Sequence, residues 1–239
     1  MNRLQAELHR LHLAREPQPS AGGDASAMVL ELARPAHWQT LSKAWQGVQA
    51  DLGLPAPAIA ISGTDAYQLW FSLAEPAPAA QASAFLDALR RHYLAGVMPD
   101  RIRRVPCDGS APNQLLPVLP PIEALPGQWS AFVAPDLATL FEAEPWLDLA
   151  PSPDAQADLL SRLVSIQPGD LARALERLRA IETPPPPSTT PAQAHRLAAP
   201  SQESDPRQFL LDVMNDRSID LHLRIEAAKA LLPYFANTP

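Results

Sequence analysis

The alternation of hydrophobic and polar positions predicts a β-α-β-β-α order in the first half of the chain. Apolar β-formers fill residues 28–33, 57–62 and 67–73, and each run has the length of a strand. Large apolar residues recur at helical spacing in residues 35–52 and again in residues 79–94. This order predicts an α+β fold with a mixed sheet, an RRM-like βαββα core and helices on one face of the sheet.

The same patterns predict further elements on both sides of this core. Leucines at positions 4, 8 and 11 indicate an amphipathic helix in residues 2–15. Short strands are expected at residues 101–105, 114–118 and 128–133. Helices are expected at residues 135–142, 155–166 and 169–181. We therefore assign residues 1–182 to one α+β domain.

Four consecutive prolines interrupt the pattern at residues 184–187 and favour extended polyproline geometry. Residues 183–204 are therefore predicted to be a Pro-rich linker. Beyond it, Asp205 and Pro206 are typical of a helix start, and residues 205–239 are predicted to form a helical hairpin. Two short helices bury little apolar surface, so the hairpin is expected to dock on the main domain or on a partner. The residues expected to bind a protein partner are Phe209, Val213, Met214, Ile225 and Leu231.

Charge is unevenly distributed along the chain. The net charge of −7 argues against a protein that coats nucleic acid by bulk electrostatics. However, five arginines lie between positions 90 and 104, whereas no lysine or arginine occurs between Arg104 and Arg162. Either the basic cluster meets phosphates, or it is a solvated face neutralised by the acidic stretch that follows it.

Other sequence features narrow the function classes. No apolar run approaches the roughly 20 residues that span a bilayer, and the first residues lack the apolar core of a secretory signal. We therefore expect a cytoplasmic protein without a membrane partner. Cys107 is the only cysteine, which excludes a disulfide within the chain and a zinc site built on cysteine pairs. No metal or other cofactor is expected.

Residues 58–79 carry a specific sequence motif: two predicted strands joined by the turn Ser62-Gly63-Thr64-Asp65, followed by the segment Glu-Pro-Ala-Pro-Ala. This motif resembles archaeo-eukaryotic-type DNA primases, and the resemblance extends in order and spacing over residues 28–95. In that family the turn and the second strand help to hold the incoming nucleotide. The resemblance implies nucleotide or nucleic-acid contacts for Ser62, Gly63, Thr64, Tyr67 and Gln68.

The primase family also places two acids, spaced by one, on a single strand to hold divalent metals. Glu31 corresponds to one of these acids, but Ala33 stands at the other position, and Gln68 stands where the family has a histidine. The resemblance therefore implies a non-catalytic protein that keeps a nucleotide-sized groove. Arg101, Arg103 and Arg104 are expected to meet the phosphates of a single-stranded nucleic acid.

The segment at residues 205–234 carries a second motif, DPRQFLLDVMND followed by LRIEAAKALLPY. It resembles the tail of small terminase subunits and related phage-type proteins, which implies a helical docking module and a phage or mobile-element origin.

Two further functions remain open from the sequence. A residual metal-dependent nucleotidyltransferase would need a divalent metal held by Glu31 together with an acid such as Asp65 or Asp136. A protein-interaction adaptor would instead act only through residues 205–234.

Overall fold

The computed structural model describes residues 2–13, 24–106, 117–182, 224–225 and 228–229. The chain divides into two compact units, Met1–Pro186 and Pro187–Pro239. In the second unit, residues 224–225 and 228–229 have helical backbone, and the side chain of Ile225 is exposed. The predicted linker, the other expected partner-binding residues (Phe209, Val213, Met214, Leu231) and most of the predicted strand at 114–118 lie outside the described residues.

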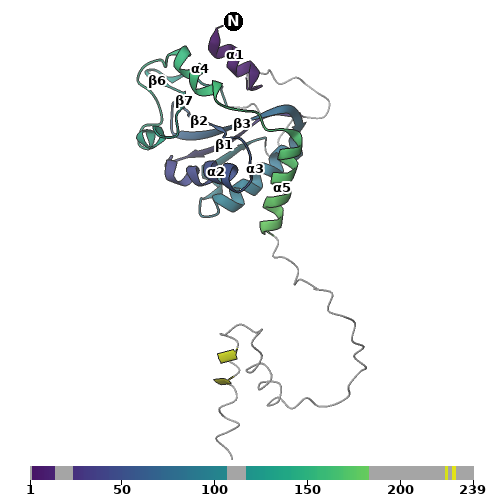
Figure 1. Ribbon diagram of the computed structural model, residues 1–239. Coiled ribbons are helices and arrows are strands. Elements are labelled where there is room, and N and C mark those ends of the chain that lie inside the picture. The colour runs from purple at the N-terminus through teal and green to yellow at the C-terminus, as the bar shows by residue number, and fades with distance from the viewer. Residues whose placement is uncertain (1, 14–23, 107–116, 183–223, 226–227, 230–239) are drawn as a thin grey trace, which may run out of the picture. The chain divides into compact units, whose positions relative to one another are not determined.

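Five strands of the first unit form one sheet, in the order β4-β1-β3-β2-β7 (Figure 1). Every pairing in this sheet is antiparallel. The predicted α+β class is confirmed. The sheet is antiparallel and not mixed, because β1 and β2 do not pair with each other: β3 lies between them and is antiparallel to both. The strands are β1 (Asp24–Ala33), β2 (Ala58–Ile61), β3 (Ala66–Pro78), β4 (Ile102–Val105) and β7 (Ala131–Val133). A separate two-stranded sheet joins β5 (Glu123–Leu125) to β6 (Gln128–Trp129).

The predicted RRM-like core is present. Helix α2 (Trp38–Ala50) connects β1 to β2, and α3 (Ala79–Tyr93) connects β3 to β4. With the central strand order β4-β1-β3-β2, these elements make the split β-α-β-β-α-β arrangement. The β3 strand continues to Pro78, beyond the predicted end at residue 73.

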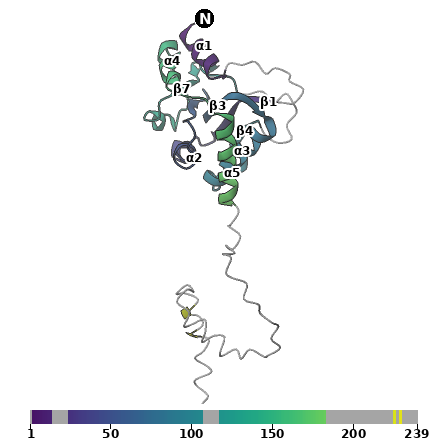
Figure 2. The same ribbon diagram turned by 45° about the vertical axis from the view of Figure 1, so that its right-hand side comes forward.

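One face of the sheet packs against α2, α3 and α5 (Pro168–Glu182), and we call it the α2–α3–α5 face. Figure 2 shows α5 beside α3. The strand residues of this face are large and apolar, and the apolar residues predicted at helical spacing in residues 35–52 join the same core. The ring centroid of Trp38 in α2 lies 5.8 Å from that of Tyr67. The strands contribute Met28, Leu30, Leu32, Ile59, Ile61, Tyr67, Leu69 and Phe71.

Two helices cover the opposite face, so the expectation of helices on one face alone is wrong. Helices α1 (Arg3–Arg10) and α4 (Pro153–Ser161) pack on it, and we call it the α1–α4 face. Figure 1 shows α1 and α4 on the other side of the sheet from α2 and α3. The reason is that alternate residues of the strands are also apolar at this end of the sheet and need a cover: Ala27, Val29, Ala58, Ala60, Trp70 and Phe132.

Hydrogen bonds fix these two covering helices. Arg10 of α1 donates to the main-chain oxygens of Leu160 and Leu163, over 2.9 and 3.0 Å. The Ser72 hydroxyl of β3 donates to the main-chain oxygen of Leu11, over 2.6 Å. The predicted helix at residues 135–142 is a short 3-10 helix, η2 (Ala138–Phe141), and a second 3-10 turn, η1 (Pro99–Arg101), precedes β4.

Helices α2 and α3 approach each other closely at Gly47. The ring of Tyr93 lies over this glycine, where a Cβ atom would be 2.2 Å from the Tyr93 Cε1. The Tyr93 hydroxyl donates to Asp51 Oδ2 over 2.9 Å, and burial raises the pKa of Tyr93, with that hydrogen bond adding to the effect.

Among the residues that the structure describes, no helix is both long enough and apolar enough to cross a membrane.

Candidate functional site

Three of the residues expected to contact nucleic acid lie side by side across the centre of the sheet. Glu31 of β1 is paired in register with Gln68 of β3 on one side and with Arg103 of β4 on the other. Their chain neighbours face the α2–α3–α5 core, so these three side chains project from the α1–α4 face. Together with Trp70, two residues along β3 from Gln68, they form what we call the polar strip.

Hydrogen bonds fix the orientation of the Gln68 amide. Its Nε2 donates to Glu31 Oε2 over 2.7 Å, and its Oε1 accepts from Trp70 Nε1 over 2.9 Å. A carboxylate only accepts and an indole N–H only donates, so the reversed amide would lose both bonds. Gln68 is 4% exposed. The glutamine is therefore a buried, internally satisfied link between the acid and the tryptophan.

Arg103 is the solvent-facing end of the polar strip. Its Nη1 lies 4.0 Å from Glu31 Oε1, and its side chain is 49% exposed, against 15% for the side chain of Glu31. A half-exposed guanidinium next to the sheet retains donors that can reach a ligand. The acid is thus covered by an amide on one side and a cation on the other.

The other two arginines of the predicted phosphate-binding set point elsewhere. Arg104 faces the α2–α3–α5 side, where it forms an ion pair with Asp87 of α3. Arg101 donates to the main-chain oxygens of Ala33 and Pro35, over 3.1 and 2.6 Å, and so ties the end of β1 to the start of β4. Within this set, Arg103 alone belongs to the polar strip.

The turn between β2 and β3 is closed by its own hydrogen bonds. Ser62 Oγ accepts from the main-chain N–H groups of Thr64, Asp65 and Ala66, over 3.0 to 3.2 Å. Gly63 donates its N–H to the main-chain oxygen of Pro145 over 3.0 Å. Gly63 also has a φ of +80°, and a Cβ there would lie 2.8 Å from Ser130 N. These turn amides are therefore engaged within the fold.

Tyr67, also expected to contact a nucleotide, lies on the α2–α3–α5 face. It is fully buried, and its hydroxyl donates to the main-chain oxygen of Ala138 in η2. Burial, with a further contribution from the Glu142 carboxylate, raises the pKa of Tyr67. Its position makes it a core residue and separates it from the polar strip by the thickness of the sheet.

Two of the three acids considered for a metal site, Glu31 and Asp65, have other partners. Asp65 Oδ2 accepts from Arg34 Nε over 2.6 Å, and Glu31 accepts from Gln68. In the described ranges, no group of three or more His, Cys, Asp or Glu side chains is placed to hold a metal ion.

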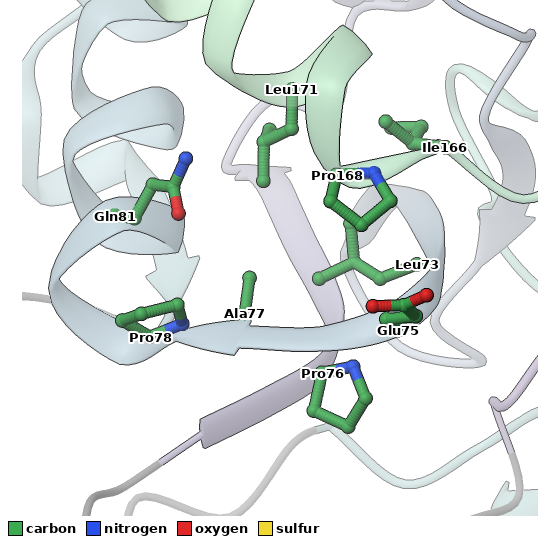
Figure 3. Close-up of a pocket in the computed structure, with 9 residues that line it drawn as sticks. All are labelled: Leu73, Glu75, Pro76, Ala77, Pro78, Gln81, Ile166, Pro168 and Leu171. Atoms are coloured by element: carbon green, nitrogen blue, oxygen red, sulfur yellow. The ribbon is translucent and has the colours of Figure 1, made fainter.

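A small cavity of about 100 Å³ lies where the end of β3, the start of α3 and the start of α5 meet (Figure 3). Its lining includes four residues of the Glu-Pro-Ala-Pro-Ala motif, Glu75 to Pro78, which form the end of β3. The polar side chains in its lining are Glu75 and Gln81, and no arginine or lysine is among the described lining residues. Its chemistry does not suit a phosphate, so we place the candidate site at the polar strip.

Fold and site together define an α+β protein whose split β-α-β-β-α-β sheet carries a buried acid–amide pair with one exposed arginine. No protein-family model, curated protein or solved structure matches the chain.

Proposed function

We propose that this is a non-catalytic, nucleic-acid-associated protein, derived from a primase-like domain of phage or mobile-element origin. It binds single-stranded nucleic acid at the Arg103 end of the polar strip. One observation carries the proposal: Glu31, at the position of a metal-holding acid in the primase resemblance, accepts a hydrogen bond from Gln68 and lies beside Arg103.

The surroundings of Glu31 support the absence of metal chemistry. A divalent ion needs several oxygen ligands. The neighbouring β1 residues that face the same way, Val29 and Ala33, have side chains without a ligand atom. To bind a metal, the Glu31 carboxylate would have to give up its hydrogen bond from the Gln68 amide. The metal ion would also lie next to the Arg103 guanidinium, and the two positive charges would repel each other.

A further arginine at the same end of the sheet, Arg34, supports a phosphate contact, and Arg101 fixes the main chain beside it. Arg34 directly follows β1, and its side chain is 83% exposed. Arg101 bonds to the residues on either side of Arg34. Arginine is well suited to phosphate because its planar donors match two phosphate oxygens. The partners Asp65 and Glu31 offset part of this charge, so we expect weak binding that depends strongly on salt.

The test measures the fluorescence anisotropy of a labelled oligothymidylate against the full chain over a series of salt concentrations. We expect micromolar affinity at low salt and a several-fold loss on Arg103→Ala. Two phosphate contacts, from Arg103 and Arg34, would give a slope of log K against log salt of about −1.4. The matched control is Arg173→Ala, which removes an equally charged and more exposed arginine from α5.

Two outcomes contradict the proposal. One is the absence of binding at low salt, and the other is an equal loss of affinity in the Arg103 and Arg173 variants. Circular dichroism of both variants checks that the fold is retained.

A further inference from the structure

A second surface feature lies at the β7 edge of the sheet, the edge opposite Arg103 of β4. It adjoins the polar strip only at Trp70, whose ring meets that of the lining residue Phe132 edge to face, with centroids 6.5 Å apart. An open apolar groove of about 400 Å³ runs between β7, the η2 segment and α4. We call it the α4 groove. Its lining is mostly apolar, and it consists of Phe132, Val133, Ala134, Leu137, Phe141, Leu147, Ala155, Gln156, Asp158, Leu159 and Arg162.

The α4 groove exposes large apolar side chains that folding alone does not require at the surface. Leu137, which lines the groove, is 48% exposed, and Leu140 in η2 is 72% exposed. Neighbouring exposed apolar residues around a hollow are typical of a surface that binds another molecule.

Gln156 determines whether a partner can bind at the α4 groove by adding a strand to the sheet. The outer strand of the sheet at this point is β7, whose free edge could pair with an added strand. However, Gln156 Oε1 accepts from Phe132 N over 2.7 Å, and Gln156 Nε2 donates to Phe132 O over 2.9 Å. The buried amide thus occupies the main-chain groups that an added strand would need, and a partner has to bind through its side chains.

Acidic residues adjoin the apolar lining along the chain. Along the chain, each of five apolar lining residues has an acid as its immediate neighbour: Asp136 and Leu137, Phe141 and Glu142, Leu147 and Asp148, Asp154 and Ala155, Asp158 and Leu159. Arg162 is the one cation in the lining, and the stretch from residue 105 to 161 contains no lysine or arginine. Arg3 of α1 pairs with Asp158 over 2.6 Å, so Arg3 and Arg162 offset two of these five acids. The acids next to the lining still outnumber these two cations, which favours a positive partner.

We propose that the α4 groove binds an amphipathic helix of a partner protein. Such a helix inserts apolar side chains at i, i+4 and i+7 and carries lysine or arginine along both flanks. A helix satisfies its own main-chain hydrogen bonds, so it needs no free strand edge. Its basic flanks meet the acids that adjoin the lining, while its leucines cover Leu137 and fill the hollow. This binding is separate from the nucleic-acid contact proposed at the polar strip.

The experiment uses the full chain and a fluorescein-labelled model peptide of leucine and lysine, about 18 residues or five helical turns long. Two comparison peptides are included. One has the same composition in a scrambled, non-amphipathic order, and the other carries glutamate in place of lysine. We expect micromolar binding of the amphipathic lysine peptide and at least about fivefold weaker binding of both others.

Variants place this binding on the α4 groove. Leu137→Lys introduces a cation in the lining, and we expect it to weaken binding at least about fivefold. Met98→Lys is the matched control, because Met98 is 65% exposed and is not part of the groove lining. Either residue projects into solvent, so neither change is expected to unfold the protein.

Three outcomes overturn the inference: no peptide binding, equal binding of the scrambled or the acidic peptide, or equal effects of the Leu137 and Met98 variants. A fourth outcome also overturns it: labelled oligothymidylate binding that Leu137→Asp weakens and Arg103→Ala does not, since the groove would then take nucleic acid.

Discussion

The two faces of the sheet differ in what their side chains require. On the α2–α3–α5 face, strand residues such as Leu30, Leu69 and Phe71 need only neighbours of the right volume. On the α1–α4 face, Glu31, Gln68 and Trp70 each carry polar atoms that need a specific partner at a specific distance. Since both sets alternate along the same strands, one backbone supports two kinds of interaction.

This contrast shows where function can be placed in such a fold. A face held by volume alone tolerates one apolar side chain for another of similar size, but it offers a ligand no polar groups. A face stabilised by specific hydrogen bonds tolerates fewer substitutions, and here it presents a charged group at its edge, the Arg103 guanidinium. Substitutions on each face of the sheet test this contrast.

Removing volume from the α2–α3–α5 face gives the largest loss of stability. Phe71 is 1% exposed and meets the ring of Phe85 edge to face, with centroids 5.9 Å apart. We expect Phe71→Ala to lower the free energy of unfolding by about 3–5 kcal/mol, because it leaves a cavity in a close-packed core. Urea denaturation measures this change. A loss below about 1 kcal/mol would mean that this face is loosely packed.

Removing a partner atom from the α1–α4 face comes next. Gln68→Met keeps the approximate volume but leaves the Glu31 carboxylate and the Trp70 N–H without their amide, so we expect a loss of about 1–3 kcal/mol. The double variant Gln68→Met with Glu31→Met should lose less stability than the sum of the losses in the two single variants, because it no longer has a carboxylate without a partner. Additive losses in this double-mutant cycle would show that the two side chains do not interact.

A hydroxyl on the volume-dominated face gives a smaller, pH-dependent effect. Tyr67→Phe removes the hydrogen bond to Ala138 O and should cost about 1 kcal/mol at neutral pH. Burial raises the pKa of folded Tyr67 above its ordinary value near 10, so the unfolded chain releases this proton first. The free energy of unfolding of the native protein should therefore fall as pH rises above about 10.

Urea denaturation from about pH 8 to about pH 11 tests this dependence, and the fall should be shallower in Tyr67→Phe. Tyr93 keeps part of the fall in that variant, because its pKa is raised as well. Equal slopes in the two proteins would contradict the assignment to Tyr67.

The smallest effects distinguish two adjacent arginines of β4. Arg104→Ala should destabilise by less than about 1 kcal/mol, since its pair with Asp87 is partly exposed. Arg103→Ala should change stability by no more than about 0.5 kcal/mol. Their order should reverse in the anisotropy measurement, where only Arg103→Ala weakens nucleic-acid binding. The same order in both measurements would argue against separate roles for the two faces.

Local patterns predicted the central elements, because each depends on residues close in sequence. The apolar run at residues 28–33 lies within β1, and the helical spacing at residues 79–94 matches α3 closely. The extension of β3 to Pro78 was missed because Glu75 and Pro76 are typical of a turn. This segment instead pairs with the start of β1, where Ala77 lies opposite Ala25 and Pro78 opposite Asp24, residues far away along the chain.

The cover of α1 and α4 could not be predicted for a related reason. Each helix was expected, but their meeting on one face depends on contacts such as Arg10 with Leu160, which no local pattern records. For the candidate site, the sequence analysis named Glu31, Gln68 and Arg103 as site residues, and the strand register places them side by side. It did not show that Arg103 and Arg104 lie on opposite faces of the sheet. Which of the two faces the core depends on the pairing register of β4, a strand of only four residues. It also gave no sign that Trp70 completes the network.

The close approach of Tyr93 to Gly47 limits how this sequence can change over generations. A glycine inside a helix is about 1 kcal/mol worse than alanine, so replacement by alanine is ordinarily favoured. Here the added methyl group would collide with the Tyr93 ring. A smaller residue at position 93 would have to come first, and it would give up the hydrogen bond to Asp51. The two positions are thus expected to vary together among descendants of this chain.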